Sequence, residues 1–369
     1  GAAAFGNVFK IPELKKKVFF TLGILVVYRI GAHIPTPGIN SAALAEVMAR
    51  MTGTIMGFFD MFSGGALSRL TIFALGIMPY ISSSIILQLM TMVSPYLARL
   101  KKEGEQGQKK ITQYTRYGTI VLSMIQSSGI AVGLEAMKSP SGNPLVPMPG
   151  WDFRVMTVLT LTAGTTLLMW LGEQITERGI GNGISLIIFA GIVAGTPAAI
   201  FQSMDLMGTG ELSVLVMLFL MVFMTAVVGA IVFTEGGQRR ISIQYAKRVV
   251  GRKMYGGQST HLPLKVNTSG VIPPIFASSI IMFPATIAQF TPHPWMQNFS
   301  ALLTPGTIIY SLIFIGAIFF FCYFYTAVIF NPIDVADNMK KHGGFVPGIR
   351  PGPKTSEYID EILSKITFY

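Results

Sequence analysis

Charged side chains are scarce in this chain. Only 12% of its 369 residues are Asp, Glu, Lys or Arg, whereas 51% are hydrophobic, and the mean hydropathy is +0.56. Its apolar runs reach about 20 residues, the length that crosses roughly 30 Å of hydrocarbon. Such runs are longer than a soluble core needs, so the composition excludes a soluble globular protein and predicts a membrane protein.

Residues that carry chemistry are also few. Cys322 is the single cysteine, which excludes a disulfide framework, and the four histidines have no carboxylate or cysteine at metal-ligand spacing. The glycines of 179–183 resemble a phosphate-binding loop only loosely, because no soluble strand precedes them and the lysine is missing. We therefore expect a turn between helices there, and neither an enzyme nor a protein with a metal or cofactor.

Eight apolar runs are predicted to be membrane-spanning helices, so the fold class is an all-α polytopic membrane protein. They lie at 18–34, 72–93, 117–137, 154–172, 183–201, 212–234, 270–290 and 306–330, after an N-terminal cytoplasmic segment at 1–17. The sequence turns apolar again at 359–368, which predicts that it stops within the start of a ninth span.

Basic residues are unevenly distributed between the predicted loops. With a cytoplasmic N-terminus, the inner segments hold 23 of the 28 Lys and Arg residues, and Arg29 lies within the first span. Cytoplasmic loops of membrane proteins are enriched in Lys and Arg, so this distribution predicts that orientation. The formal charge of +11 is then partly a consequence of topology and not the usual signature of nucleic-acid binding.

Two segments 194 residues apart read almost alike. Aligned without gaps, they share Gly76 and Gly270, Pro79 and Pro273, Ile81 and Ile275, and Ser84 and Ser278. Each opens an apolar run, and the charge distribution makes the two runs cross the bilayer in opposite directions. An inverted repeat with proline-bearing helices is typical of transport proteins. The sequence thus predicts an inverted-repeat helical bundle with halves at 18–201 and 202–369.

The predicted spans carry almost no charge, which argues against an ion-coupled transporter, because those usually hold ionisable groups inside the membrane. Their polar residues concentrate on the two repeated helices: Ser82, Ser83, Ser84, Gln88, Thr91, Ser278 and Ser279. Such side chains commonly hold helices together. The alternative is that the two helices form a separable seam.

Three stretches between the spans stand out. Residues 57–70 are too apolar for an ordinary loop and too broken to span, so we expect a short helix folded back into the protein. The inner loop 234–267 is basic, and the alternation of Ile241, Ile243 and Tyr245 with polar residues predicts a hairpin. In the inner loop 331–358, prolines and glycines predict a stiff turn that presents Arg350.

Six long motifs are specific enough to indicate a family: 60–69, 74–81, 113–118, 172–185, 258–267 and 345–352. They closely resemble the SecY family, the channel subunits of the bacterial Sec protein translocon, and the resemblance runs from about residue 10 to the end. The family has ten spans in two inverted halves, so its last helices are not covered by this sequence.

The resemblance implies a mid-membrane ring of apolar side chains, matched here by Ile77, Ile81, Ile184, Ile188 and Ile275. Two i,i+4 pairs among them place two isoleucines on one helix face, although packing is an equal alternative. Beneath the ring the family has a plug, which 57–70 matches; its named residues are Phe58, Phe59, Asp60, Phe62, Gly64, Gly65 and Arg69.

A lateral gate and a docking surface are also implied. The second and seventh spans match the gate, for which we name Ser82, Ser83, Gln88, Asn267, Thr268, Ser278 and Phe283. The basic loops match the surface that binds the motor and the ribosome, including ribosomal RNA: Arg239, Arg240, Lys247, Arg248, Arg252, Lys253, Lys340, Lys341 and Arg350. For most of these cations, topology alone is a sufficient explanation.

The expected function is a protein-conducting channel of the bacterial inner membrane that moves unfolded preproteins across and releases transmembrane segments sideways. The resemblance implies SecE and SecG as companion subunits, SecA or the ribosome as the energy source, and signal sequences, nascent chains and lipid as ligands. One alternative is a secondary transporter of a small solute with the same inverted-repeat design. A weaker alternative is a membrane scaffold or insertase component without its own pore.

Overall fold

The computed structural model describes residues 11–51, 55–137, 143–245, 248–250, 253–255, 259–270, 272–290 and 307–368. It forms two compact units: residues 1–204 with 278–312, and residues 205–277 with 313–369. The predicted second half, 202–369, includes residues 278–312, which in the structure belong to the first unit. The division into two inverted halves remains a prediction.

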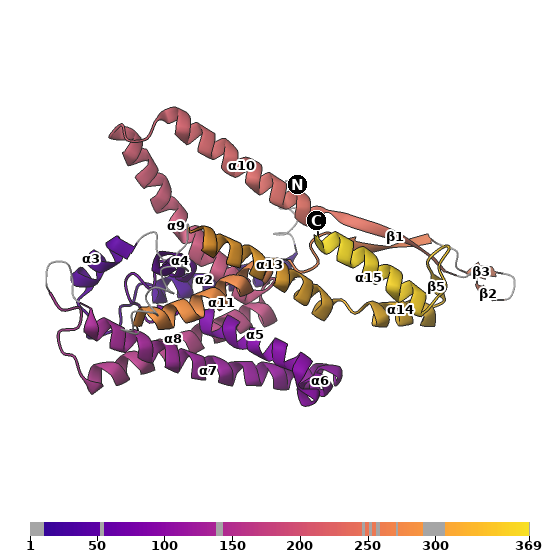
Figure 1. Ribbon diagram of the computed structural model, residues 1–369, viewed down its shortest axis with the longest axis horizontal. Helices are drawn as coiled ribbons and strands as arrows, with labels where there is room; N and C mark the ends of the chain where they lie inside the picture. The colour runs from indigo at the N-terminus through magenta and orange to yellow at the C-terminus, as the bar shows by residue number, and fades with distance from the viewer. Residues whose placement is uncertain are drawn as a thin grey trace. The chain divides into compact units, whose positions relative to one another are not determined.

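Over its described residues, the first unit consists of helices joined by turns and loops. Its helices are α2 (Pro12–Gly31), α3 (Ser41–Met51), α4 (Ile55–Ser63), α5 (Met78–Val93), α6 (Pro95–Lys102), α7 (Glu105–Ala136), α8 (Trp151–Arg178), α9 (Gly183–Gly208) and most of α11 (Ile272–Phe290). Helices α5, α7 and α8 lie side by side (Figure 1). Small residues line the buried face of α7, where the hydroxyls of Thr115 and Thr119 bond to carbonyls of their own helix. Such residues let apolar helices approach closely.

The second unit contains α10 (Val214–Gly236), a sheet, and the helices α13 (Ile308–Ile329), α14 (Pro332–Lys341) and α15 (Pro353–Phe368). The sheet has the order β4-β1-β5, from β4 (Ser259–Lys265), β1 (Gln238–Tyr245) and β5 (Gly344–Phe345). The antiparallel pairing of β1 with β4 confirms the hairpin predicted from the alternation in 241–245. A smaller hairpin joins β2 (Arg248–Val250) to β3 (Lys253–Tyr255).

Five of the described helical segments are long and apolar enough to cross a membrane, or six if the bent pair α5 and α6 forms one span. They are α7, α8, α9, α10 and α13 with its continuation. Helices α2 and α11 overlap the two remaining predicted spans, 18–34 and 270–290. The count of eight spans remains a prediction.

The repeated segments begin alike in the structure. Gly76 and Gly270 both have a left-handed backbone, at φ +56° and +64°, and each precedes a helix with proline in its first turn. Glycine adopts this conformation without penalty, and proline is tolerated where a helix begins. The predicted span 72–93 is therefore wrong at its start: residues 72–77 form turns, and the helix begins at Met78, beside Pro79.

Candidate functional site

The segment between α4 and α5 is non-helical and forms part of the core of the first unit. Ala66, Thr71 and Ala74 are fully buried, as the sequence led us to expect for irregular backbone at membrane depth. The carboxylate of Asp60 organises the turn after α4, because it accepts a 2.7 Å hydrogen bond from Ser68 N, and Asp60 O accepts one from Gly65 N. The motif at 60–69 is thus a self-contained turn that ends the short helix.

The end of α4 is bound to α2. The hydroxyl of Tyr28 donates to Ser63 O at 3.1 Å, and Nη1 of Arg29 donates to Gly64 O at 3.1 Å. These carbonyls are at the C-terminus of α4, where a helix has no intrahelical donors for them. Arg29, which the sequence analysis noted only as a charge within a span, therefore has a defined partner.

Glycines let two other elements approach the same point. A Cβ on Gly64 would lie 2.9 Å from the Cα of Gly191 in α9, and a Cβ on Gly191 would lie 3.0 Å from Phe62 O. A Cβ on Gly76, just before α5, would lie 3.6 Å from the Cβ of Ser63. The end of α4 is thus enclosed by α2, α9 and the start of α5.

The predicted ring residues of the first unit lie on these same elements. Ile77 follows Gly76 directly, Ile81 is one turn into α5, and Ile188 is one turn before Gly191 in α9. These three are 5–7% exposed, and Ile184 is half-buried. Ile275 is half-buried near the start of α11, in the second unit. The structure therefore brings Ile77 and Ile188 near the end of α4, within the predicted plug.

The predicted plug residues occupy two parts of this site. Phe58, Phe59, Asp60 and Phe62 belong to α4, which confirms the expected short helix, and Gly64 and Gly65 have φ of +69° and +79° in the turn that follows. Arg69 is exposed in the next turn. Glycine is required at those two angles because other residues rarely adopt them.

Helix α5 makes polar contacts with two neighbouring helices: with α7 through the predicted gate residue Ser83, and with α11 through Met78, which was not predicted. Ser83 Oγ donates to Thr115 O of α7 at 2.9 Å, so Ser83 joins α5 to α7, which is the helix-packing alternative left open by the sequence. Ser279 of α11 instead donates to Sδ of Met78 at 3.5 Å, which brings the two repeated helices together. Ser82 and Gln88 are half-buried, and Gln88 Nε2 donates to Ser84 at 3.4 Å. Ser278 is buried in α11.

Asn267 has local partners in the second unit. Its Nδ2 donates to Glu235 at 2.6 Å and to Gly270 O at 3.2 Å, and its Oδ1 accepts from Gly270 N at 2.9 Å. Thr268 donates to Lys265 O at 3.0 Å. Asn267 thus braces the turn that leads into α11, and Phe283 lies further along that helix.

The two basic loops fold into one structure, which the sequence did not predict. Strand β5, from the loop 331–358, pairs with the end of β1, from the loop 234–267, through Gln244 with Phe345 and Tyr245 with Gly344. Apolar residues of both loops share one core: Ile241, Ile243, Leu264, Met339, Val346, Ile359, Ile362 and Leu363. Cations more than 100 residues apart in the sequence therefore lie on one folded surface.

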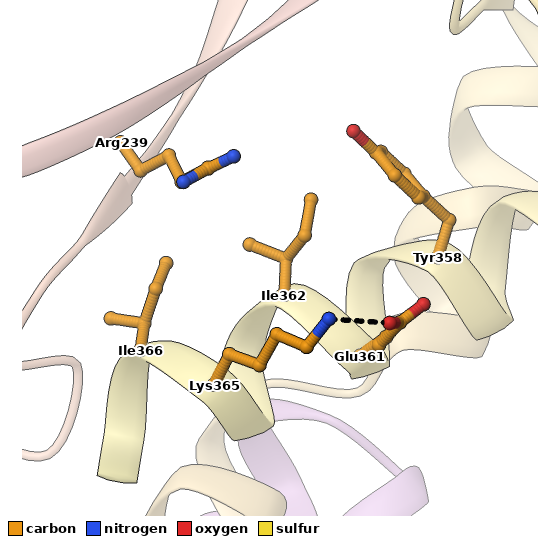
Figure 2. A pocket seen from close by; sticks show the side chains of 6 residues that line it. All are labelled: Arg239, Tyr358, Glu361, Ile362, Lys365 and Ile366. Carbon is orange, nitrogen blue, oxygen red and sulfur yellow. Dashed lines mark hydrogen bonds and ion pairs between the residues drawn. The ribbon is translucent and has the colours of Figure 1, made fainter. Parts of the chain in front are cut away.

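Arg239 and Arg240 are consecutive residues of β1, so their side chains point to opposite faces of the strand. Arg240 points to the face opposite Ile241, whereas Arg239 lines a cavity of about 290 Å³ above α15. Figure 2 shows Arg239 across this cavity from Tyr358, Ile362 and Ile366. Lys365 and Glu361 at its edge form an ion pair at 2.6 Å, so Arg239 gives the cavity a net positive charge.

Arg350 lies on a turn with fixed backbone, as predicted. Val346 and Ile349, which precede Arg350, pack into or against the shared core, and the hydroxyl of Thr355 donates to Arg350 O at 2.9 Å. The side chain of Arg350 is exposed, as are those of Lys340 and Lys341 at the end of α14. Arg248 and Lys253 belong to the β2–β3 hairpin, whereas Lys247 and Arg252 lie outside the described residues.

Sequence reasoning missed Tyr28, Gly191 and the donor role of Arg29. The lone cation in the first predicted span was the available signal for Arg29, because such residues usually have a partner inside the protein. No local pattern distinguishes Gly191 from the other glycines of α9.

Known proteins resemble this chain in sequence over most of its length. A family model described as SecY matches residues 71–369. The protein translocase subunit SecY of Escherichia coli (strain K12) is 57% identical over 361 residues, which are 97% of this chain and 81% of the relative. The subunit of Vibrio cholerae is 54% identical over 364 residues, with the same two coverages.

Solved structures share the fold. A structure described as a protein conducting channel has a TM-score of 0.64 at 16% identity, covering 96% of this chain and 82% of that one. A SecY protein whose plug domain is described as stabilising the closed state has a TM-score of 0.64 at 17% identity and the same coverages. Sec61 in the canine ribosome-channel complex has a TM-score of 0.60 at 16% identity, covering 96% and 84%.

We expect Gly191→Ala to displace the end of α4, because the added methyl group would lie 3.0 Å from Phe62 O and 3.3 Å from Gly64 N. The measurement is the rate at which maleimide labels a reporter, Ala66→Cys in a Cys322→Ser background, and this rate should rise several-fold. Gly195→Ala is the matched control, since nothing lies within 4 Å of its added methyl group. Equal labelling of the two variants would contradict the close packing of α9 against α4.

Proposed function

The chain belongs to the SecY family and is a protein-conducting channel; on that premise we propose that it moves unfolded preproteins across the bacterial inner membrane and releases transmembrane segments sideways into lipid. Its N-terminus would be cytoplasmic, in keeping with the distribution of basic residues. The observation that carries the mechanism is the convergence of α2, α5 and α9 on the end of α4, beside Ile77 and Ile188.

The proposed constriction is formed by Ile77, Ile81, Ile184, Ile188 and Ile275. Isoleucine side chains can close a narrow pore to water and ions by dewetting, and they offer a passing polypeptide neither charge nor a fixed dipole to hold it. The segment 57–70 would seal the pore beside this ring in the resting channel. Both features support a conduit for a chain of varied sequence.

A small-solute transporter is not favoured. Relatives more than half identical over almost the whole chain are protein translocase subunits. The basic, folded surface of the second unit also suits the docking of a macromolecule better than the handling of a small solute. We propose that a motor such as SecA and the ribosome bind there, and that SecE and SecG complete the channel.

The conduit is tested by replacing Ile81, Ile188 and Ile275 together with Gly. We expect ions to leak through the resting channel in planar bilayers, because the dewetted constriction depends on apolar bulk. The matched control replaces Ile86, Ile192 and Ile280, which are exposed on the same three helices. Conductance at background in the first variant would refute the ring assignment.

The gate is proposed to lie between α5 and α11, supported by the contact of Ser279 with Met78. Hydrogen bonds between membrane helices are worth roughly 0.6–2 kcal/mol, and the thioether of Met78 is a weak acceptor, so an apolar signal helix could part this contact. In a Cys322→Ser background, cysteines at positions 78 and 279 should cross-link in the idle channel and block export until they are reduced. Cysteines at 83 and 279 are the control, since Ser83 bonds to α7. Cross-linking of 78 with 279 that leaves export intact would place the gate elsewhere.

The docking surface is tested with Arg350→Glu. We expect motor-driven export into vesicles to be lost while insertion of the channel itself continues, because the exposed side chain of Arg350 contributes little to the core beneath it. Lys354→Glu reverses an exposed charge four residues away and should have little effect, since that lysine forms only a surface ion pair with Glu357. Export at the parent level with Arg350→Glu would exclude this residue from motor docking.

A further inference from the structure

Arg29 is a cation in an otherwise apolar part of α2. Among the residues that the structure describes, no carboxylate lies within ion-pair distance of its guanidinium, and its partner is the carbonyl of Gly64 at 3.1 Å. Cations inside membrane proteins are costly and are usually paired with acidic groups or with backbone carbonyls. This contact is therefore the observed compensation for placing a charge in the first predicted span.

The acceptor of Arg29 is suited to a cation. Gly64 follows Ser63, the last residue of α4, and the C-terminal end of a helix carries a partial negative charge and carbonyls without intrahelical donors. Tyr28 donates to the preceding carbonyl, Ser63 O. Two adjacent residues of α2 thus bind two consecutive carbonyls at the end of α4.

Tyr28 is held in place independently of α4. Its side chain is 2% exposed, and its ring stacks on Phe73 with centroids 6.0 Å apart and planes at 25°. Gly31 lets Phe73 lie directly against α2, because a Cβ at that position would overlap the phenyl ring. The contact with Phe73 therefore orients the Tyr28 ring so that its hydroxyl points at Ser63 O.

We propose that Tyr28 and Arg29 act as a clamp that positions the segment 60–70 in the closed channel. This rests on the proposed function, in which that segment seals the pore. The clamp consists of directional hydrogen bonds to main-chain atoms at residues 63 and 64, whereas Leu67 and Leu70 hold the rest of the segment by apolar burial. Gly191, which permits the close approach, sets the depth at which the segment is held.

The test uses the full-length protein in its membrane complex, with the Ala66→Cys reporter in a Cys322→Ser background. We expect Arg29→Gln to raise the maleimide labelling rate of the reporter several-fold and to raise the resting ion conductance. Arg29→Lys should give an intermediate result, since lysine retains the charge but not the planar fork of donors. Tyr28→Phe should give a smaller increase, because it keeps the ring on Phe73 and removes only the hydroxyl.

Two controls separate the clamp from general loosening. A second reporter, Ala131→Cys, is fully buried in α7 and should stay protected in every variant. Lys16→Gln removes an exposed cation from the same helix and should match the parent. Should Arg29→Gln prevent assembly, Tyr28→Phe and Arg29→Lys carry the test.

The two readouts distinguish the clamp from the plug. Labelling of position 66 at the parent rate in Arg29→Gln would overturn the clamp, as would equal gains at positions 66 and 131. Increased labelling at position 66 alone, with conductance at background, would support the clamp and refute the assignment of this segment as the seal. Increases in both would support the two together.

Discussion

Backbone that leaves the helical conformation inside an apolar bundle must find its hydrogen bonds within the protein, and residues 64–77 are where this chain meets that constraint. The segment does so with tight turns and with bonds to the loop after α2, from Ile72 N to Ile34 O and from Thr36 N to Leu70 O. Helices then approach its main chain through glycine: Gly164 of α8 lies against Ile72 O, and Gly191 of α9 against Gly64. An irregular segment can therefore be the centre of a helical unit.

The two ends of this segment are held by different kinds of contact. Residues 66–75 are anchored by buried side chains such as Leu70 and Phe73, each 1% exposed. At residues 63 and 64 the contacts are instead hydrogen bonds and glycine surfaces, which contribute on the order of 1 kcal/mol each and bury little apolar area. Local opening should begin where few apolar contacts must be lost, so α4 should move first and the buried residues from Ala66 onward should become accessible only after it.

Structures set by neighbouring residues could be predicted from the sequence, whereas contacts between residues far apart in the chain could not. The alternation around Ile241 predicted the hairpin, and prolines and glycines predicted the turn at Arg350, because each signal acts within a few residues. Apolar content alone placed the second helix too early, since it could not separate buried turns at 72–77 from a helix that begins at Met78. The contacts of Ser83 with α7 and of Tyr28 with Ser63 join positions 32 and 35 residues apart, and no short-range pattern encodes them.

The pairing of β5 with β1 gives the basic surface a mechanical connection to the membrane. Helix α10 ends at Gly236 and β1 begins at Gln238, while α13 ends at Ile329 and α14 begins at Pro332. Phe330, in the second joint, packs against the shared core, and Val266 N bonds to Gly237 O in the first. Joints this short leave few free backbone torsions. The core beneath Arg350 is therefore joined closely to the ends of α10 and α13, so a partner that moves this core also moves those two helix ends.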